Sequence, residues 1–157
     1  MLKNLHKGEF GLEGTVSFNR FGVDILVLIE DGVDIPYAEQ CVAALNSLCE
    51  TTIDLLCKYS EKYCRDFCES VGEECPEINT PRDILQYIYP LALIVDKPQD
   101  SDVVVHLELN CEWEPEHGME WIIKGKEILY VGSFNGESAY EERSYYEMCG
   151  NYVYDNV

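Results

Sequence analysis

The chain is poor in basic residues, with 11 Lys and Arg against 30 Asp and Glu, which gives a formal net charge of −19. Such a charge repels DNA, RNA and anionic membrane surfaces, so we expect neither nucleic-acid nor membrane binding. Long hydrophobic runs are also missing, since the apolar stretches at 25–29 and 91–95 are far shorter than the ~20 residues of a membrane-spanning helix. The N-terminus reaches Gly8 and Glu9 before any run of signal-peptide length, which predicts a cytoplasmic protein.

Catalytic fingerprints are absent as well. Ser133 lies in Gly-Ser-Phe-Asn-Gly, which differs from the Gly-x-Ser-x-Gly turn that exposes a hydrolase nucleophile. The sequence has no phosphate-binding loop and no dinucleotide fingerprint. A cysteine nucleophile needs a base, and the nearest pairing of this kind joins Cys111 on an expected strand to His117 in the following turn. We therefore expect no catalytic residues and no cofactor.

The eight cysteines do not have the pattern of a disulfide framework. Five of them recur at helical spacing, namely Cys41, Cys49, Cys57, Cys64 and Cys68. Residues seven apart on a helix are separated by about 10 Å along its axis, so Cys57 cannot bridge Cys64. Free thiols are typical of a reducing compartment. A thiolate metal set of Cys57, Cys64, Cys68 and Cys75 matches no standard spacing, so we interpret these residues as small buried side chains.

What the sequence does contain predicts one α+β domain over residues 1–157. Hydrophobic residues make up 46% of the chain, which is enough for a sizeable core. The alternating segments 10–18 and 23–29 predict an N-terminal β-hairpin, and apolar residues on both faces of the second segment indicate a central strand. Strict alternation over Val103–Trp113 predicts another strand, which Met119–Ile123 and Ile128–Val131 extend into a C-terminal meander.

Two or three helices are expected between these strands. Asp34 and Pro36 suit the start of a first helix, and Ser47 and Glu50 have the spacing of a capping box for a second. The second helix ends at Gly72, and a short helix over 82–89 precedes a strand at 91–95. The resulting fold is a mostly antiparallel sheet with its helices packed on one face. Asn135-Gly136 suggests a further hairpin turn.

The segment 111–121 carries the densest group of polar side chains in the chain. It holds four carboxylates and one imidazole, those of Glu112, Glu114, Glu116, Glu120 and His117. Oxygen and nitrogen ligands of this kind can bind a divalent cation, so one hypothesis is a metal-dependent enzyme that uses Glu112, Glu116, His117 and Glu120. The spacing matches neither an EF-hand nor a zinc protease, and a solvated hairpin turn is the simpler interpretation.

Aromatic residues and charge favour a second hypothesis, in which the chain binds a basic protein partner. Trp113 and Trp121 flank the acidic turn, where they serve either core packing or, if exposed, an interface. Eleven tyrosines offer contact area at low entropic cost. The surface expected to contact the partner consists of Glu112, Trp113, Glu114, Glu116, His117, Glu120, Trp121, Tyr140, Tyr145 and Tyr146.

Three segments resemble a recurring pattern. They are Ile-Leu-Gln-Tyr-Ile-Tyr-Pro at 84–90, Cys-Glu-Trp-Glu-Pro-Glu-His-Gly-Met-Glu-Trp at 111–121 and Ile-Leu-Tyr-Val-Gly at 128–132. The pattern is similar to that of a family of uncharacterised acidic bacterial proteins, and the resemblance covers mainly residues 82–136. Such domains are similar in size and charge to the immunity proteins of bacterial toxin systems. The resemblance implies a toxin-neutralising role and no particular catalytic residue.

Overall fold

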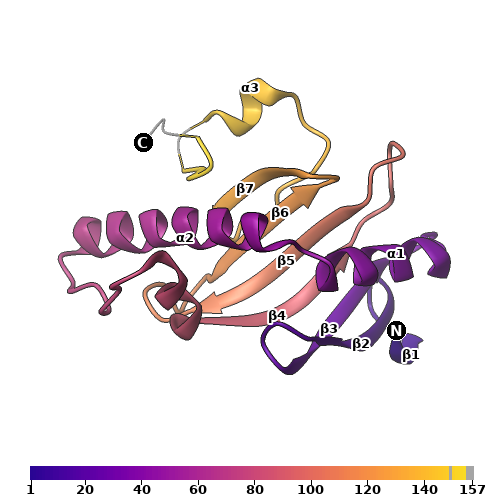
Figure 1. Cartoon of the computed structure of the whole chain (residues 1–157). Helices are drawn as coiled ribbons and strands as arrows, with labels where there is room; N and C mark the ends of the chain where they lie inside the picture. The colour runs from indigo at the N-terminus through magenta and orange to yellow at the C-terminus, as the bar shows by residue number, and fades with distance from the viewer. Residues whose placement is uncertain (149, 155–157) are drawn as a thin grey trace.

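A computed structural model describes residues 1–148 and 150–154 of the chain (Figure 1). Its strands form one seven-stranded sheet in chain order, β1-β2-β3-β4-β5-β6-β7. The strands are β1 Lys3–Lys7, β2 Gly11–Phe18, β3 Val23–Glu30, β4 Ile88–Val95, β5 Val104–Cys111, β6 Met119–Lys124 and β7 Glu127–Ser133. Neighbouring strands are antiparallel except β3 and β4, which are parallel. The predicted α+β fold with an N-terminal hairpin and a C-terminal meander is confirmed.

The parallel pair requires a long crossover, and the helices supply it. The helices α1 (Ile35–Asn46) and α2 (Glu50–Val71) and the 3-10 helix η1 (Pro81–Tyr87) connect β3 to β4 and cover one face of the sheet (Figure 1). As the sequence predicts, the Asp34 carboxylate caps α1 by accepting the Tyr37 backbone N–H at 2.8 Å. Gly72 ends α2 with a φ of 73°, a left-handed conformation that favours glycine.

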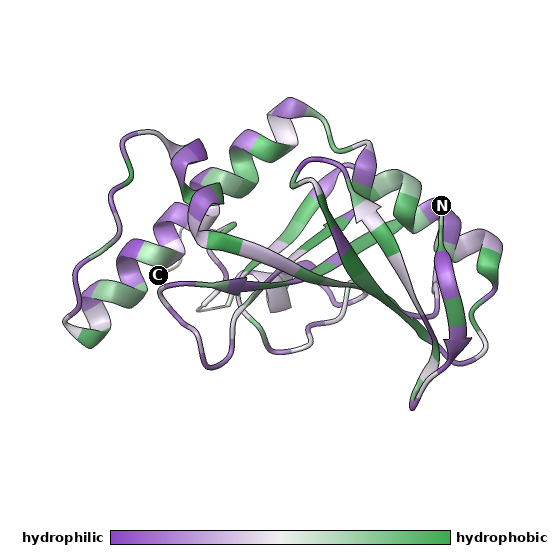
Figure 2. Cartoon of the chain, turned by 90° about the horizontal axis from the view of Figure 1, so that it is seen from below, coloured by the Kyte–Doolittle hydropathy of each residue, from purple (hydrophilic) through white to green (hydrophobic). Residues whose placement is uncertain are grey.

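The main core lies between these helices and the sheet. The strands β2 to β7 contribute residues to it, as Val27, Leu107 and Val131 illustrate, and all three are fully buried. In Figure 2 the strands are largely apolar, whereas the connecting loops are largely hydrophilic. We call the covered side the helix face and the opposite side of the sheet the second face.

The C-terminal segment, which the structure describes at residues 134–148 and 150–154, covers part of the second face. Val104, Ile122 and Tyr130, on β5, β6 and β7, pack there against Ala139 and Tyr146. The segment then pairs with the edge of β7, where the Tyr152 N–H donates to the Val131 carbonyl at 2.9 Å. It ends against the helix face, where the Tyr152 hydroxyl donates to Asp66 of α2 at 2.5 Å. Among the described residues, the C-terminal segment thus packs on both sides of the meander, whereas Leu26 on β3 stays exposed on the second face.

Two local expectations were wrong, and one strand was not predicted. Ser47 is the C-cap of α1, and Cys49 rather than Ser47 is the N-cap of α2, so the predicted capping box does not form. Asn135-Gly136 makes no hairpin, because the Asn135 N–H donates to a buried carboxylate of β6 instead. The edge strand β1 escaped prediction because all of its residues are exposed and lack a hydrophobic pattern.

Two further findings concern the membrane and the thiols. Among residues 1–148 and 150–154, no helix combines the length and the apolar character that crossing a membrane requires. The cysteines that the structure describes are all free thiols, and the eighth, Cys149, lies outside the described residues.

Candidate functional site

Both tryptophans of the predicted binding surface belong to the core. The Trp121 indole is fully buried and donates its Nε1–H to the Ser60 hydroxyl of α2 at 3.0 Å. Trp113 is 4% exposed, and its ring meets that of Tyr63 edge-on with centroids 5.7 Å apart. These two indoles hold the meander against α2, so they are not available to a partner protein.

Burial also removes several acidic and tyrosine residues from that surface. Glu114 is 5% exposed, and its carboxylate accepts the Tyr63 hydroxyl at 3.1 Å and lies 2.6 Å from Nδ1 of His117. The members of the predicted surface that are buried are Trp113, Glu114, Glu120, Trp121 and Tyr146. Tyr140 is half-buried, and those that remain exposed are Glu112, Glu116, His117 and Tyr145. Of the residues in the predicted surface, only Glu112, Glu116, His117 and Tyr145 are therefore exposed enough to contact a partner freely.

The proposed metal ligands are not brought together. Glu120 lies on the second face of β6, where it pairs with His106 of β5, whereas His117 lies in the turn and pairs with Glu114. Within the described part of the chain, Glu112, Glu116, His117 and Glu120 do not form a group whose ligand atoms approach one another closely enough to hold one ion. The structure gives the metal-enzyme hypothesis no assembled site.

The second face instead presents an uncovered apolar strip. The register aligns Glu13, Leu28, Ile94 and His106 in one row across β2, β3, β4 and β5. A neighbouring row aligns Leu26 with Ala92. Leu26 is 45% exposed, and Phe10, in the turn before β2, is 80% exposed. We call Phe10, Leu26, Leu28 and Ile94 the open face. Sequence reasoning missed it, although the apolar residues on both sides of β3 were its signal.

A groove of about 370 Å³ runs along the open face. Phe10, Leu28 and Ile94 contribute its apolar wall. Its charged lining consists of the carboxylates of Glu9, Glu13, Glu30 and Asp96, and no Lys or Arg lines it. An apolar centre with an acidic rim is the arrangement that favours a ligand with an apolar segment and positive charge around it.

A second hollow, of about 530 Å³, meets the groove at Glu30 and Asp96. Its far wall comes from the C-terminal segment through Glu137, Ser138 and Tyr140. The two hollows together lie at the border where the open face meets the part of the second face that the C-terminal segment covers. Three carboxylates, those of Glu30, Asp96 and Glu137, and one cation, Lys97, line the second hollow, so the border is predominantly acidic.

A buried ion pair lies at this border. Nε2 of His106 is 2.6 Å from Oε2 of Glu120, and Nδ1 of His106 is 3.6 Å from the carboxylate of Asp96. Burial disfavours the charged ring, but the hydrogen bonds and negative charges of Asp96 and Glu120 outweigh it and raise the pKa of His106 to about 9. His106 is thus a buried cation at neutral pH, and its charge lies 3.6 Å from the Asp96 carboxylate on the rim of the groove.

Glu108, the neighbour of Glu120 across β5 and β6, belongs to the same cluster. Burial, and after it the charge of Glu120, raises the pKa of the Glu108 carboxyl, and the charge of His106 opposes this effect. The cluster therefore consists of the imidazole of His106 and three carboxyl groups, those of Asp96, Glu108 and Glu120.

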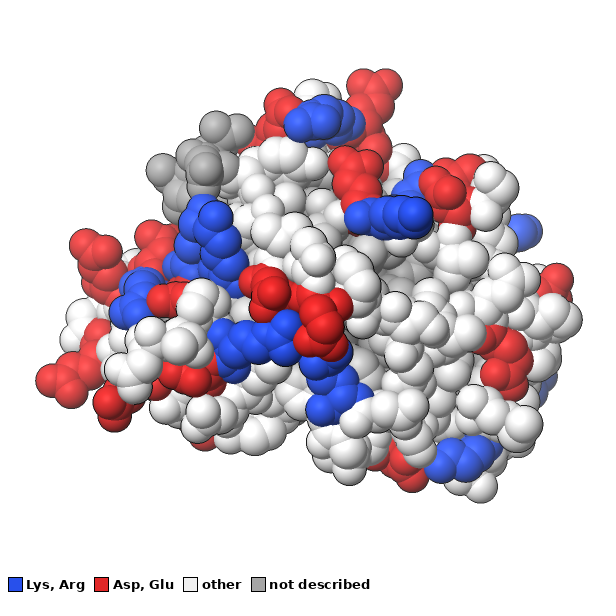
Figure 3. Space-filling view, viewed as in Figure 1, with Lys and Arg blue, Asp and Glu red and all other residues white. Residues whose placement is uncertain are grey.

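The helix face has a different charge pattern. In Figure 3, acidic and basic side chains lie next to one another on the side that carries α2. Arg82 pairs there with Glu50 and with Asp54, at 2.7 and 2.6 Å, and Arg20 also pairs with Glu50. Arg20 and Arg82 offset part of the negative charge on this side, whereas no Lys or Arg lines the groove.

Sequence reasoning also interpreted the helical cysteines as packing residues. The structure buries Cys64 and Cys68 and places Cys75 beside them, whereas Cys57 is not part of this group. Burial is the main cause of a raised pKa in Cys64 and Cys68, so both thiols are protonated at neutral pH.

Comparison with known proteins yields one match. The family described as "Domain of unknown function (DUF6985)" matches residues 1–138, which include the whole sheet and the helical crossover. No curated protein and no solved structure matches the chain.

Proposed function

The chain belongs to the DUF6985 family, and we propose that it acts by binding a basic protein partner on its open face. The observation that carries the proposal is the groove of Phe10, Leu28 and Ile94, whose charged lining consists of carboxylates alone. The partner would place an apolar segment in the groove and basic side chains on its rim.

The exposure of the open face supports this choice of surface. On β5, β6 and β7 the same side of the sheet is covered by Ala139 and Tyr146, whereas no described residue covers Leu26 or Phe10 to a similar degree. Contiguous apolar patches on a protein surface mark interaction sites, in contrast to scattered single residues. Phe10 is the natural anchor, because exposed aromatic side chains that become buried supply much of the energy of binding.

Charge supports the choice of partner. The net charge of −19 and the rim of Glu9, Glu13, Glu30 and Asp96 attract a basic protein and speed its association at low salt. Nucleic acids and anionic membranes would be repelled by the same field.

The sharpest form of the proposal is an immunity role, in which the partner is a bacterial toxin with a basic active-site cleft. Similarity in size and charge to immunity proteins supports this form. In that case the rim carboxylates occupy the cleft in place of a polyanionic substrate. The exposed acids Glu112 and Glu116 lie at the other end of the sheet, where the Tyr89 hydroxyl at the start of β4 donates to Glu112 at 2.7 Å. Glu112 and Glu116 would contact only a partner large enough to reach from the groove to the opposite end of the sheet.

Capture from the native cell lysate with matched variants tests the proposal. The tagged wild type should retain a basic protein at low salt and release it at high salt. Phe10→Ala should weaken binding by at least about 10-fold, the loss expected of an interface anchor. Glu9→Lys should slow association by roughly 3- to 10-fold at low salt.

Glu142→Lys is the matched control, because it makes the same change in net charge at an exposed position of the C-terminal segment. It should associate at nearly the wild-type rate. Equal retention by all variants, or retention that does not depend on salt, would exclude the open face as the binding surface. The absence of any specifically retained protein at either salt would overturn the binding proposal itself.

A further inference from the structure

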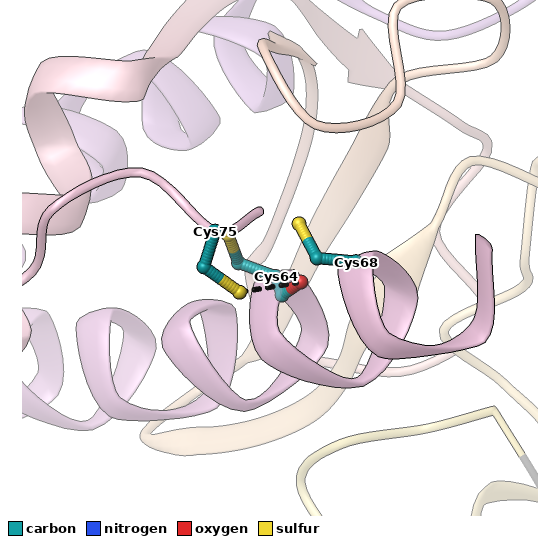
Figure 4. A group of neighbouring side chains, drawn as sticks. All are labelled: Cys64, Cys68 and Cys75. Atoms are coloured by element: carbon teal, nitrogen blue, oxygen red, sulfur yellow. Dashed lines mark hydrogen bonds between the residues drawn. The ribbon is translucent and has the colours of Figure 1, made fainter. Parts of the chain in front are cut away.

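Three thiols converge beside α2, far from the open face. Cys64 and Cys68 lie one turn apart on the helix, and Cys75 comes from the connector that follows Gly72. Their sulfur atoms all lie within 4.8 Å of one another (Figure 4). Cys64 and Cys68 are buried and Cys75 is half-buried, so the group is shielded on the helix side and reachable from the connector side.

Apart from the Cys75 thiol, which donates to the Cys64 carbonyl at 3.9 Å (Figure 4), the connector is held by contacts that do not involve the thiols. The Glu73 N–H donates to the Cys68 carbonyl at 2.9 Å, which closes the end of α2 and turns the chain back. Further along, Arg65 donates to the Ile78 carbonyl at 3.3 Å, and the Tyr87 hydroxyl donates to the Glu77 carbonyl at 3.1 Å. These bonds hold the residues on both sides of Cys75, so the fold itself brings the third sulfur to the other two.

We propose that Cys64, Cys68 and Cys75 form a three-thiolate binding site for monovalent copper, Cu(I). A metal–sulfur bond of about 2.3 Å places three sulfur ligands roughly 4 Å apart, which is close to the spacing that these thiols already have. Thiolates are soft ligands and select Cu(I), zinc or iron–sulfur clusters. The site requires only small rotations of side chains that are already neighbours.

The number of ligands favours Cu(I) over zinc. Structural zinc sites have four protein ligands in a tetrahedron, whereas Cu(I) is stable with three sulfur ligands. Over residues 1–148 and 150–154, the group contains three ligands, and no fourth His, Cys, Asp or Glu joins it. The field of an acidic protein also raises the local concentration of cations.

Binding is an exchange of protons for the metal. Up to three S–Cu bonds form as the same number of S–H bonds break, and the protons leave to the buffer. Copper enters and remains as Cu(I), so the step needs no oxidant and no reductant.

Anaerobic titration of the reduced full-length chain with Cu(I), in competition with bicinchoninate, tests the proposal. One Cu(I) per chain should bind, with thiolate-to-copper absorbance in the ultraviolet and three sulfur neighbours in X-ray absorption. Cys75→Ser should weaken binding by more than about 100-fold, since loss of a direct ligand exceeds the effect of an outer-shell change. Cys75 is half-buried on the connector, so this variant is expected to keep the fold, which circular dichroism verifies.

Cys49→Ser is the matched control, because Cys49 is an exposed thiol at the start of α2 and lies outside the group. It should bind Cu(I) as the wild type does. Cys68→Ser supplies a second ligand variant and should also weaken binding. Wild-type affinity in Cys75→Ser, an equal loss in Cys49→Ser, or displacement of Cu(I) by an equal concentration of Zn²⁺ would overturn the assignment.

Discussion

His106 and Glu120 form a buried ion pair between β5 and β6, with Nε2 and Oε2 separated by 2.6 Å. The other oxygen of Glu120 accepts the backbone N–H groups of Asn135 and Glu137, at 3.1 and 3.2 Å. The pair therefore connects the meander to the start of the C-terminal segment. Nδ1 of His106 also lies 3.6 Å from Asp96, which lines the groove proposed to bind a partner.

The protonation of His106 provides the first prediction. The pKa of His106 is raised to about 9, because the effects of Asp96 and Glu120 outweigh burial. An NMR titration should show one imidazole that stays protonated to about pH 9, and its signal should vanish in His106→Asn. A titration of this ring at or below its ordinary pKa would show that the buried pair is not ionic.

The same pKa predicts how stability depends on pH. Because the folded pKa of about 9 exceeds the unfolded value of 6.5, the contribution of His106 is fully present below pH 6.5 and is lost as pH rises through about 9. The difference in free energy of unfolding between the wild type and His106→Asn should shrink over this window by up to roughly 3 kcal/mol. Urea unfolding at both ends of the window measures it. A difference that is constant or grows with pH would contradict the account.

The bond between Ser60 and Trp121 provides a third prediction. Ser60→Ala leaves a buried indole N–H without its acceptor, which should reduce the free energy of unfolding by about 1 to 3 kcal/mol. Ser70→Ala is the control on the same helix, because Ser70 is exposed, and it should cost less than about 0.5 kcal/mol. Thermal unfolding compares the two variants. Equal costs would mean that the Ser60 hydroxyl contributes no specific bond.

Gly132 provides a fourth prediction, which concerns the packing of the C-terminal segment against β7. A Cβ atom at this position would lie 2.6 Å from the Gly150 carbonyl oxygen. Gly132→Ala should therefore push the C-terminal segment off β7 and cost about 1 to 3 kcal/mol. Limited proteolysis should then cut within residues 134–154 faster than in the wild type. Unchanged stability and unchanged cleavage would show that the segment is not held closely against β7.

The sheet could be predicted where apolar and other residues alternate along a strand. Alternation over Val103–Trp113 gave the right strand and the right buried side, as β5 and the core residues Leu107 and Leu109 show. On β3, apolar residues on both sides correctly indicated a central strand, which lies between β2 and β4, but they did not reveal that Leu26 is 45% exposed on one side. The hydrophobic pattern of a strand shows which of its faces are apolar, but it does not reveal which other segment covers each face.

The candidate site was harder to predict because its contacts join residues far apart in the sequence. The acidic turn looked solvated, yet Glu114 is buried by Tyr63, which lies 51 residues earlier on α2. Glu120 is similarly buried against His106 of the preceding strand. Burial of a carboxylate requires such partners, and single-sequence patterns do not identify them. The three thiols illustrate the same point, since no spacing rule connects Cys75 to α2.

Oxidative footprinting of the complex with the captured basic protein tests the central claim most directly. Phe10 and Leu26 are exposed on the open face, and Tyr145 and Met148 are exposed on the C-terminal segment, at 41% and 59%, as internal comparators. The open-face account predicts that the partner protects Phe10 and Leu26 from hydroxyl radicals and leaves Tyr145 and Met148 as reactive as in the free chain. Protection of Tyr145 and Met148 with no change at Phe10 would contradict it.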